Sequence, residues 1–466
     1  MFNRNRIQQL HFVGIGGSGM SGIAEVLLNL GYQVSGSDLK ESEATRRLVS
    51  LGARVHLGHA AEHARGAQVV VVSNAVMATN PEIAEAKRLK IPVIPRAEML
   101  NELMRLKYGV CIAGTHGKTT TTSMAGLVLK QGGLDPTIVI GGVLGALGSN
   151  ARLGQGDYFV VEACEAYGSF LHLSPSVAVV TNIDNDHLDY YQNMDSLKEA
   201  FVRFVNKLPF YGFALACGDD PGVASVLPRL ERRAVTYGFG PGNDLVAADL
   251  RGEGLESSFE VRRQGAALGR LALGVPGRHN ALNALAAAGV GMELGLSFDT
   301  AAQALRGFTG AQRRFQVKGE AAGVRVVDDY AHHPTELAAT LAAARSTLKP
   351  GGRLLAAFQP HLYSRTQLLY RDFARSLALA DEVFLCDIYP AREVPIPGVT
   401  TQLIVDSLKA EGFDKARYRP GRDELLEEVL GSLKEGDLFL TLGAGSIDRL
   451  GDAVLERLKR ASGTKV

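Results

Sequence analysis

Two glycine-rich turns, each between an apolar segment and a helical one, constrain this chain more than any other feature of its sequence. The first lies in HFVGIGGSGMSG at 11–22, and the second lies in VCIAGTHGKTTTT at 110–122. In such turns, glycines let backbone amides approach a phosphate at the positive end of a helix. A strand, glycine turn and helix in this order are typical of parallel α/β sheets. The sequence therefore predicts two α/β domains, each with its own phosphate site.

Short apolar runs alternate with amphipathic stretches along most of the 466 residues, as in βαβ units on parallel sheets. A second such series begins near residue 108, and a third occupies the last part of the chain. The segment from Asp244 to Leu273 alternates instead, which predicts an antiparallel hairpin on the second domain. We therefore predict three α/β domains, at 1–107, 108–312 and 313–466.

The balance of charge argues against a general nucleic-acid or membrane-surface role. Fifty basic and 49 acidic residues leave a net charge of +1, so anionic ligands must be held by local sites. No apolar run reaches the roughly 18 residues of a membrane span. The four cysteines are isolated, as expected for reduced thiols; they are Cys111, Cys164, Cys217 and Cys386. We expect a cytoplasmic multi-domain enzyme with no nucleic-acid partner.

The first glycine turn alone leaves its ligand open. Gly14, Gly16 and Gly19 match GxGxxG, and Asp38 ends the next predicted strand, where a ribose-binding acid belongs. NAD or FAD, another nucleotide diphosphate and a purely structural turn all remain compatible with this pattern. The turn also carries the hydroxyls of Ser18 and Ser21, and no hydride-transfer residues are evident downstream.

The second turn predicts ATP binding. In a P-loop, Lys118 would neutralise charge on the β- and γ-phosphates, and Thr119 would offer a hydroxyl to Mg²⁺. The loop is shortened, because Ile112 stands where the earlier glycine of the full pattern belongs. Glu162 and His187 each follow a predicted parallel strand and would meet Thr119 at one sheet edge. These three side chains predict a magnesium site.

Three histidines, His56, His59 and His63, have a spacing that suits one helical face and could suggest zinc. No cysteine or carboxylate that would support a metal is recognisable beside them in the sequence. We therefore interpret them as a solvated segment between a loop and a helix.

Taken together, the motifs resemble those of the Mur ligases along essentially the whole chain. The motifs, in family order, are GIGGSGMSG, SGSD, GTHGKTTTT, TNIDNDHLD, GRHNALNALAA, RRFQ, DDYAHHPTE, FQPHLYSRT and LGAGSI. The resemblance implies N- and C-terminal Rossmann-like domains that flank a central P-loop ATPase-like domain. It also implies that ATP phosphorylates the lactyl carboxylate of UDP-N-acetylmuramate and that L-alanine displaces the phosphate.

The resemblance also assigns residues. By this resemblance, the residues expected to bind the UDP-sugar are Gly16, Gly17, Ser18, Gly19, Ser37, Asp38, Ser73 and Asn74. The residues expected to bind ATP are Gly114, Thr115, His116, Gly117, Lys118, Thr119, Thr120, Asn280, Asn283, Arg314 and Asp328. The expected Mg²⁺ ligands are Thr119, Glu162 and His187. Tyr330, His332, His333, His361 and Arg365 would receive the amino acid and the developing oxyanion, beside the catalytic Lys118. Adjacent histidines in an extended segment point to opposite faces, which argues against a metal pair at His332 and His333.

The chain departs from the family pattern at three positions. Cys164 and Tyr167 stand where aspartates are usual, and Leu362 stands where arginine is frequent. Three alternatives are kept: a sister ligase that adds a recycled murein tripeptide, an NAD-dependent oxidoreductase with an accessory P-loop and, because of the altered segment EACEAY, an inactive nucleotide-binding scaffold. We expect a monomer or weak dimer.

Overall fold

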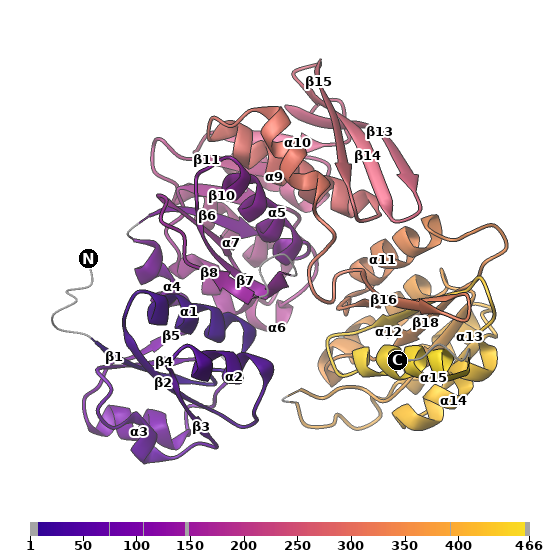
Figure 1. Cartoon of the computed structure of the whole chain (residues 1–466), viewed down its shortest axis with the longest axis horizontal. Helices are drawn as coiled ribbons and strands as arrows, with labels where there is room; N and C mark the ends of the chain where they lie inside the picture. Colours follow the sequence, from indigo (N-terminus) through magenta and orange to yellow (C-terminus); the bar gives the residue numbers. More distant parts are fainter. Residues whose placement is uncertain (1–7, 74, 106, 145–148, 392, 462–466) are drawn as a thin grey trace. The chain divides into compact units, whose positions relative to one another are not determined.

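The structure is a computed structural model that describes residues 8–73, 75–105, 107–144, 149–391 and 393–461 (Figure 1). Its strands form three sheets, of five, ten and six strands. Internal contacts divide the chain into two compact units. The first comprises Met1–Asp249, Phe259–Leu271 and Leu282–Phe308, and the second comprises Leu250–Ser258, Ala272–Ala281 and Thr309–Val466.

The N-terminal sheet has the order β3-β2-β1-β4-β5, and every neighbouring pair is parallel. The glycine turn follows β1, where the strand order reverses, and such switch points are where open α/β sheets bind ligands. The elements are β1 (Gln9–Val13), α1 (Ser18–Asn29), β2 (Gln33–Asp38), α2 (Glu43–Ser50), β3 (Arg54–Leu57), η1 (Ala61–Ala64), β4 (Val69–Val72), α3 (Pro81–Arg88), β5 (Val93–Pro95) and α4 (Arg96–Met104).

The central sheet has the order β15-β14-β13-β12-β11-β10-β6-β9-β7-β8, with β6 parallel to both of its neighbours. The strands are β6 (Tyr108–Ala113), β7 (Thr137–Leu144), β8 (Ser149–Arg152), β9 (Tyr158–Glu162), β10 (Val177–Val180), β11 (Phe213–Cys217), β12 (Ala234–Gly238), β13 (Leu245–Glu253), β14 (Glu256–Arg263) and β15 (Ala266–Leu273). The helices are α5 (Lys118–Gln131), η2 (Ala166–His172), α6 (Leu188–Tyr191), α7 (Met194–Asn206), α8 (Pro221–Val226), η3 (Leu227–Arg229), α9 (Arg278–Glu293) and α10 (Phe298–Arg306). The expected hairpin is thus three strands, and these extend the central sheet.

Within the first unit, α1 packs on strands β7 and β8 of the central sheet. The Asn150 side-chain amide donates to Ser21 Oγ at 2.8 Å, and Ser149 Oγ donates to a carboxylate oxygen of Glu25 at 2.8 Å. Glu25 is buried and also accepts two hydrogen bonds from Arg47. The helix that begins at the first glycine turn is therefore anchored to the domain that carries the second.

The C-terminal sheet has the order β16-β17-β21-β18-β19-β20, in which the edge strand β16 is antiparallel and the other pairs are parallel. Apolar strands such as LLAAF at Leu354–Phe358 are fully buried, as a two-sided helical cover requires. The elements are β16 (Gln316–Ala321), β17 (Val324–Asp329), α11 (Pro334–Ser346), β18 (Leu354–Phe358), α12 (Tyr363–Leu377), β19 (Glu382–Leu385), α13 (Gln402–Ala410), β20 (Ala416–Tyr418), α14 (Arg422–Ser432), β21 (Leu438–Leu442) and α15 (Asp448–Ala461).

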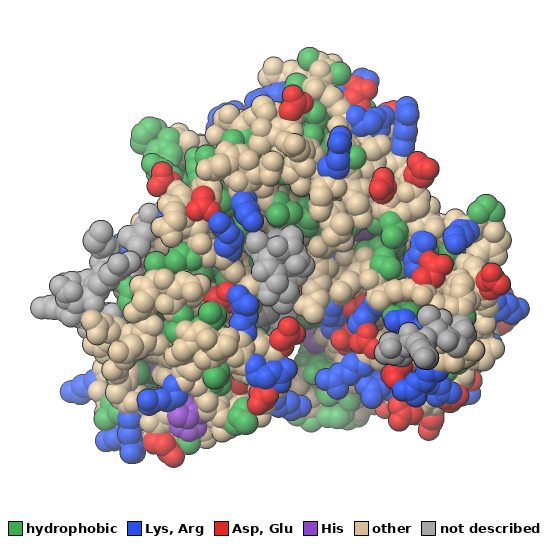
Figure 2. All heavy atoms as spheres, in the orientation of Figure 1, with side chains coloured by type: hydrophobic (Ala, Val, Ile, Leu, Met, Phe, Trp, Pro, Cys, Tyr) green, Lys and Arg blue, Asp and Glu red, His purple; other side chains and the backbone are tan. Residues whose placement is uncertain are grey.

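The surface carries charges of both signs. Basic and acidic side chains are interspersed on the face drawn in Figure 2, in keeping with the near-zero net charge. Among the described residues, none of the helices combines the length and the hydropathy that crossing a membrane would require.

Candidate functional site

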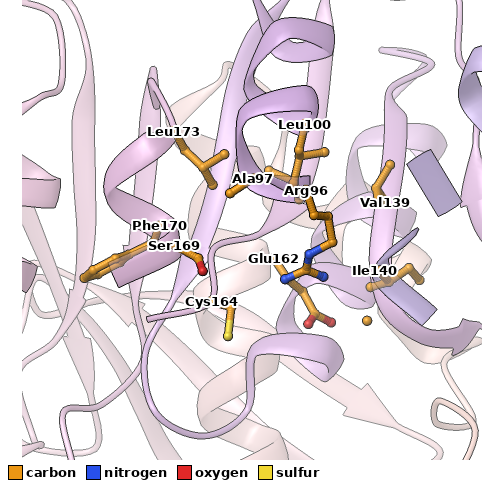
Figure 3. A pocket seen from close by; sticks show the side chains of 13 residues that line it. Arg96, Ala97, Leu100, Val139, Ile140, Glu162, Cys164, Ser169, Phe170 and Leu173 are labelled. Carbon is orange, nitrogen blue, oxygen red and sulfur yellow. The ribbon is translucent and has the colours of Figure 1, made fainter. Parts of the chain in front are cut away.

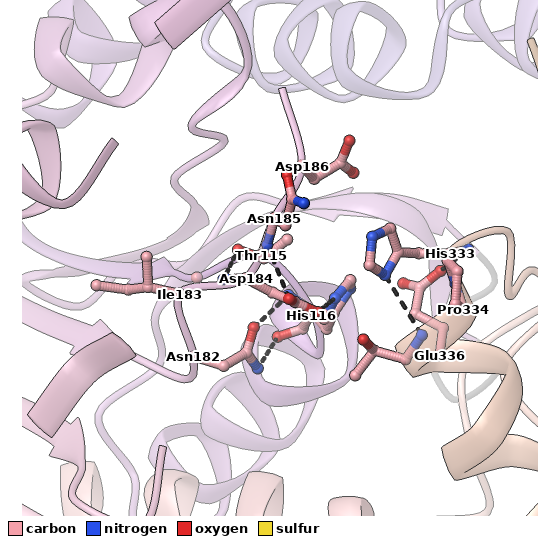
Figure 4. A network of polar contacts seen from close by, with 12 residues as sticks. Thr115, His116, Asn182, Ile183, Asp184, Asn185, Asp186, His333, Pro334 and Glu336 are labelled. Atoms are coloured by element: carbon pink, nitrogen blue, oxygen red, sulfur yellow. Dashed lines mark hydrogen bonds and ion pairs between the residues drawn. The ribbon is translucent and has the colours of Figure 1, made fainter. Parts of the chain in front are cut away.

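The second glycine turn is held in shape by the segment that follows β10 (Figure 4). Asn182 accepts from the His116 amide at 2.7 Å and donates back to the His116 carbonyl at 3.0 Å. The Asp184 carboxylate lies 2.9 Å from His116 Nε2. Gly114 and Gly117 have φ values of +132° and +81°, which favour glycine. These contacts and backbone angles hold the loop in a defined form.

Lys118, the first residue of α5, is folded back over this loop. Its ammonium donates to the carbonyl oxygens of Gly114 and Thr115 at 2.6 and 2.9 Å, and to Glu165 at 2.9 Å. Burial opposes the charge on Lys118, but the nearby Glu165 carboxylate outweighs this and raises the pKa of the lysine. Lys118 is therefore a cation at neutral pH, positioned at the turn where P-loops bind phosphate.

The three predicted magnesium ligands lie on elements that converge on this loop. Thr119 is in the first turn of α5, Glu162 ends β9, and His187 precedes α6. Glu162 Oε1 is buried and has no hydrogen-bond partner among the described residues. His187 has a left-handed backbone, with φ of 57°, and its Nε2 lies 3.7 Å from Glu165 Oε1. An unpaired buried carboxylate oxygen fits a hard cation.

At the first glycine turn, the structure separates residues that can face a ligand from those that brace the loop. The N-cap Gly17 provides no side-chain cap for α1, which leaves the first-turn amides suited to an anion. The Asp38 carboxylate accepts from the Gly16 amide at 2.8 Å, so it fixes the turn. Ser73 Oγ accepts from the Ala75 amide at 3.3 Å. Asn74 and the Ser18 side chain lie outside the described part of the structure.

Ser37 belongs to a buried polar cluster. Its hydroxyl donates to Glu82 at 2.7 Å and lies 3.0 Å from His59 Nδ1. Glu82 is completely buried and also contacts His11 Nε2 at 2.8 Å and His63 Nδ1 at 3.5 Å. The interpretation of the three histidines as a solvated segment was therefore wrong for His59 and His63. Glu82 could not be recognised beside these histidines in the sequence, because it lies on α3, 23 residues after His59.

In the second unit, three of the predicted amino-acid side chains form a row of rings that meet edge to face. The Tyr330 ring lies 5.4 Å from the His332 ring, and the His332 ring lies 5.8 Å from the His361 ring. The row ends at Tyr389, whose ring stacks on His361. Arg365 lies in the first turn of α12, the helix that follows His361. The row thus brings together three of the five residues assigned to the amino acid.

His333 stands apart from this row because it caps α11. Its side chain accepts from the Thr335 amide, and Glu336 accepts in return from the His333 amide. This reciprocal arrangement is a helix-capping box. A catalytic role for His333 stays a prediction, while its structural role is evident.

Two neighbouring arginines, Arg313 and Arg314, lie at the start of the C-terminal domain, and Arg313 makes hydrogen bonds within that domain. Arg313 donates to Asp328 at 2.9 Å and to the carbonyls of Gly445 and Gly443, and both Arg313 and Arg314 lie over the Tyr330 ring. Asp328 is fully buried, and its second oxygen accepts from Thr441 at 2.6 Å. Asp328 therefore braces this site through both oxygens, and its predicted contact with ATP stays a prediction.

The two asparagines of α9 also differ. Asn283 Oδ1 accepts from Thr121 at 3.1 Å and lies beside Gly117, so it contacts the P-loop helix. The Asn280 amide donates to the carbonyl of Pro276 at 2.7 Å. Asn283 therefore lies beside the predicted ATP loop, and the assignment of Asn280 to ATP stays a prediction.

Comparisons with known proteins decide the family. Residues 9–108 match the Mur ligase family catalytic domain, 112–291 match the Mur ligase middle domain, and 313–445 match the Mur ligase glutamate ligase domain. The chain belongs to the Mur ligase family.

Full-length relatives share about half of this Mur ligase's residues. UDP-N-acetylmuramate–L-alanine ligase from a Geobacter species is 54% identical over 98% of this chain and 99% of the relative. The protein of the same name from Geotalea daltonii is 52% identical over 98% of this chain and 99% of its own length. The crystal structure of UDP-N-acetylmuramate-alanine ligase from Thermotoga maritima is similar with a TM-score of 0.84 and 30% identity, covering 97% of this chain and 99% of the other.

Sequence reasoning did not assign a role to Glu165, Arg313 or Glu82 in this Mur ligase. Each is a charged residue whose partner lies 15 or more residues away in the sequence. The only sequence signal was that Glu165 remains acidic within the altered segment EACEAYGSF. Tyr167, in the same segment, has φ of 54° and packs its ring on Tyr190. Leu362 has φ of 72° at the N-cap of α12, and nothing in the structure explains a leucine there.

Proposed function

We propose that this Mur ligase joins L-alanine to the lactyl carboxylate of UDP-N-acetylmuramate at the expense of ATP, in peptidoglycan precursor synthesis. Full-length relatives named UDP-N-acetylmuramate–L-alanine ligase are more than 50% identical to this chain, and they support this choice of substrates. The geometric observation that carries the proposal is the P-loop, with a charged and partly buried Lys118 paired with the buried Glu165. We place the enzyme in the cytoplasm as a monomer or weak dimer, with domain boundaries near Lys107 and Gln312.

The chemistry proceeds in two steps. A lactyl carboxylate oxygen attacks the γ-phosphorus of ATP, and ADP leaves with the electrons of the broken bond. The amine of L-alanine then attacks the acyl carbon, phosphate leaves, and the amine loses a proton. Lys118 would stabilise charge on the transferred phosphoryl group, and Arg365 would pair with an anionic oxygen of the acyl-phosphate or the amino acid.

The other assignments follow the same scheme. The first-turn amides of α1 would hold the UDP diphosphate. The loop from Gly114 to Thr120, with Asn283, would hold ATP, and Arg314 would reach it from the C-terminal domain. Tyr330, His332 and His361 would line the amino-acid site.

Mg²⁺ fits Thr119, Glu162 and His187, because Glu162 carries a buried oxygen without a described partner. Bound there, Mg²⁺ would neutralise phosphate charge during transfer. Glu162→Gln is expected to raise the Mg²⁺ concentration for half-maximal activity by about tenfold or more, because a neutral amide binds the ion more weakly.

Titration of activity against Mg²⁺ tests this assignment, with Glu231→Gln, a change at a surface residue of the same domain, as the matched control. An unchanged Mg²⁺ requirement in Glu162→Gln would remove Glu162 from the metal site.

Phosphate release tests the proposed function directly. We expect release only when ATP, UDP-N-acetylmuramate and L-alanine are present together, with NAD having no effect. Release that is faster with a murein tripeptide than with L-alanine would favour the sister ligase. Consumption of NADH would favour the oxidoreductase, and no release under any condition would favour an inactive scaffold.

A further inference from the structure

Four aromatic side chains form a cluster on the surface of the central domain: Tyr108, Tyr158, Phe210 and Tyr211. The Tyr108 ring lies 5.9 Å from the Tyr158 ring and 6.3 Å from the Tyr211 ring. The Phe210 ring lies 5.3 Å from the Tyr211 ring. Phe210 is 95% exposed, Tyr211 is 59% exposed and Tyr108 is 49% exposed. Exposed apolar residues that are scattered singly are ordinary, but aromatic rings that gather on a surface are typical of a docking site.

Phe210 and Tyr211 are exposed because they occupy the tip of a turn before β11. The Gly212 amide donates to the Pro209 carbonyl at 2.9 Å, which closes a four-residue turn with the two aromatic residues at its centre. Small and polar residues usually occupy such positions. Because a ring that stays in water adds little to the stability of the fold, this pair points to a contact with another surface.

The aromatic cluster lies at the opposite end of the central strands from the proposed catalytic site. Tyr108 begins β6, and Tyr158 begins β9, which runs parallel to it. Glu162, the proposed magnesium ligand, ends β9 and lines a small cavity there (Figure 3). A strand of this length separates its two ends by about 13 Å. The cluster is therefore separate from the proposed substrate and metal sites.

Cations without carboxylate partners lie beside the aromatic cluster. Lys207 and Leu208 come just before the turn, and Arg232 Nε donates to the Leu208 carbonyl at 2.7 Å. Lys207 Nζ donates to the Leu173 carbonyl at 3.1 Å. Arg203 lies on α7 shortly before Lys207, and burial together with the Arg203 charge lowers the pKa of Lys207. None of these three cations pairs with a carboxylate of a residue that the structure describes.

The surface around these cations keeps a positive balance. Arg203 and Lys207 line a hollow of about 540 Å³ together with two glutamates. Glu199 pairs with Arg229, whereas Glu231 has no such partner in the described part of the chain. Three unpaired cations thus stand against one unpaired carboxylate, and this balance suits an anionic partner.

We propose that this face docks on the surface of an anionic lipid bilayer, with Phe210 and Tyr211 in the interfacial layer and the three cations facing lipid phosphates. A tyrosine ring suits that layer, because the ring leaves water while its hydroxyl stays among the headgroups. Basic side chains near an anionic bilayer add an attraction that acts within about a Debye length. A hollow lined by charged side chains offers little to the apolar side chain of a protein partner, so the charges favour a lipid surface.

Flotation with lipid vesicles tests the proposal on the full chain. We expect the wild type to float with vesicles of equal parts phosphatidylglycerol and phosphatidylcholine, and to float at least about fivefold less with phosphatidylcholine alone. The double variant Phe210→Ser with Tyr211→Ser should weaken partition into the anionic vesicles by about tenfold or more, because two rings no longer leave water. Arg203→Glu should weaken it by about tenfold, because a cation near the lipid phosphates becomes an anion.

Two matched variants serve as controls. Leu379→Ser changes a leucine of the C-terminal domain that is 45% exposed, and Arg306→Glu reverses an exposed arginine at the end of α10. Both should float as the wild type does. Thermal unfolding of all four variants should match that of the wild type, because each change lies on the surface.

Tryptophan fluorescence gives a second readout, because the chain contains no tryptophan. Phe210→Trp places a single tryptophan at the tip of the turn. Its emission should shift to shorter wavelength with the anionic vesicles, as the indole ring leaves water, and Leu379→Trp should show no shift.

Three results would overturn the proposal. The first is a wild type that floats with neither kind of vesicle, and the second is equal flotation of the wild type and the double variant. The third is self-association in sedimentation velocity that the double variant abolishes, without flotation, which would assign the face to a second copy of the chain. All three leave the proposed function intact, because the proposed catalytic site does not include the aromatic cluster.

Discussion

Replacing Lys118 by methionine is expected to lower the rate of phosphate release by about 10²- to 10³-fold, the cost of removing one preorganised charge from a phosphoryl-transfer site. Lys118 Nζ lies within 3 Å of two P-loop carbonyls and of Glu165, and these contacts hold it at the loop. The loss should appear mainly in kcat, because this charge acts on the group that is transferred.

This substitution also has a structural cost that must be separated from catalysis. The Glu165 carboxylate is 1% exposed, and without Lys118 it would be a buried charge that has lost its nearest cation. Breaking such a pair typically costs about 3 to 5 kcal/mol. The double variant Lys118→Met with Glu165→Gln removes that charge, and it should recover most of the lost stability while its activity stays low.

Initial rates and thermal unfolding measured on both variants would distinguish these effects. The matched control is Lys130→Ala, a change at an exposed lysine at the other end of α5, which should leave kcat unchanged. Recovery of activity in the double variant would mean that Lys118 serves only to neutralise Glu165. Full activity in Lys118→Met would contradict the proposed mechanism.

The fold was largely predictable because its main signals are local. A glycine turn between an apolar run and an amphipathic run determines a βα unit within some 20 residues, and this chain repeats the pattern in three series. Asp244 to Leu273 was harder, since alternation indicates strands but does not reveal whether two or three of them extend a sheet. The structure has three, and they continue the order from β12.

The site was only partly predictable, because side-chain pairing across distant segments has no sequence pattern. Lys118 and Thr119 belong to a motif, whereas their neighbour Glu165 meets Lys118 across 47 residues. A motif also cannot tell a ligand from a brace. Asp38 and Asp328 were both predicted to bind ligands. In the structure, Asp38 accepts a hydrogen bond from the Gly16 amide, and Asp328 accepts one from the Thr441 hydroxyl.

The buried cluster around Glu82 leads to the second large effect, on stability. Glu82 is completely buried at the start of α3 and accepts from Ser37, while contacting His11 at 2.8 Å and His59 at 3.1 Å. Glu82→Ala would remove the acceptor on which these side chains converge and would leave their polar atoms buried. We expect it to lower the free energy of unfolding by about 3 to 5 kcal/mol, and Glu82→Gln to lower it by about 1 to 3 kcal/mol.

The effect should depend on pH in a defined direction. Burial alone would raise the pKa of Glu82, but hydrogen bonds from His11, Ser37 and His59 outweigh it and hold the pKa at about 2, below the ordinary 4.5. A carboxyl group whose pKa is lower in the folded state contributes stability that is fully present above pH 4.5. That contribution is lost as the pH falls from 4.5 towards 2, where the folded protein also takes up the proton.

Urea unfolding of the wild type and Glu82→Gln between pH 7 and pH 3 would test both claims. The stability difference should be constant from pH 7 to about pH 5 and should shrink below that, because only the wild type carries the titrating group. Glu62→Gln, a change at an exposed carboxylate of η1 in the same domain, should shift stability by less than about 0.5 kcal/mol. A Glu82→Gln difference that grows as the pH falls would mean that the carboxylate does not stabilise the fold.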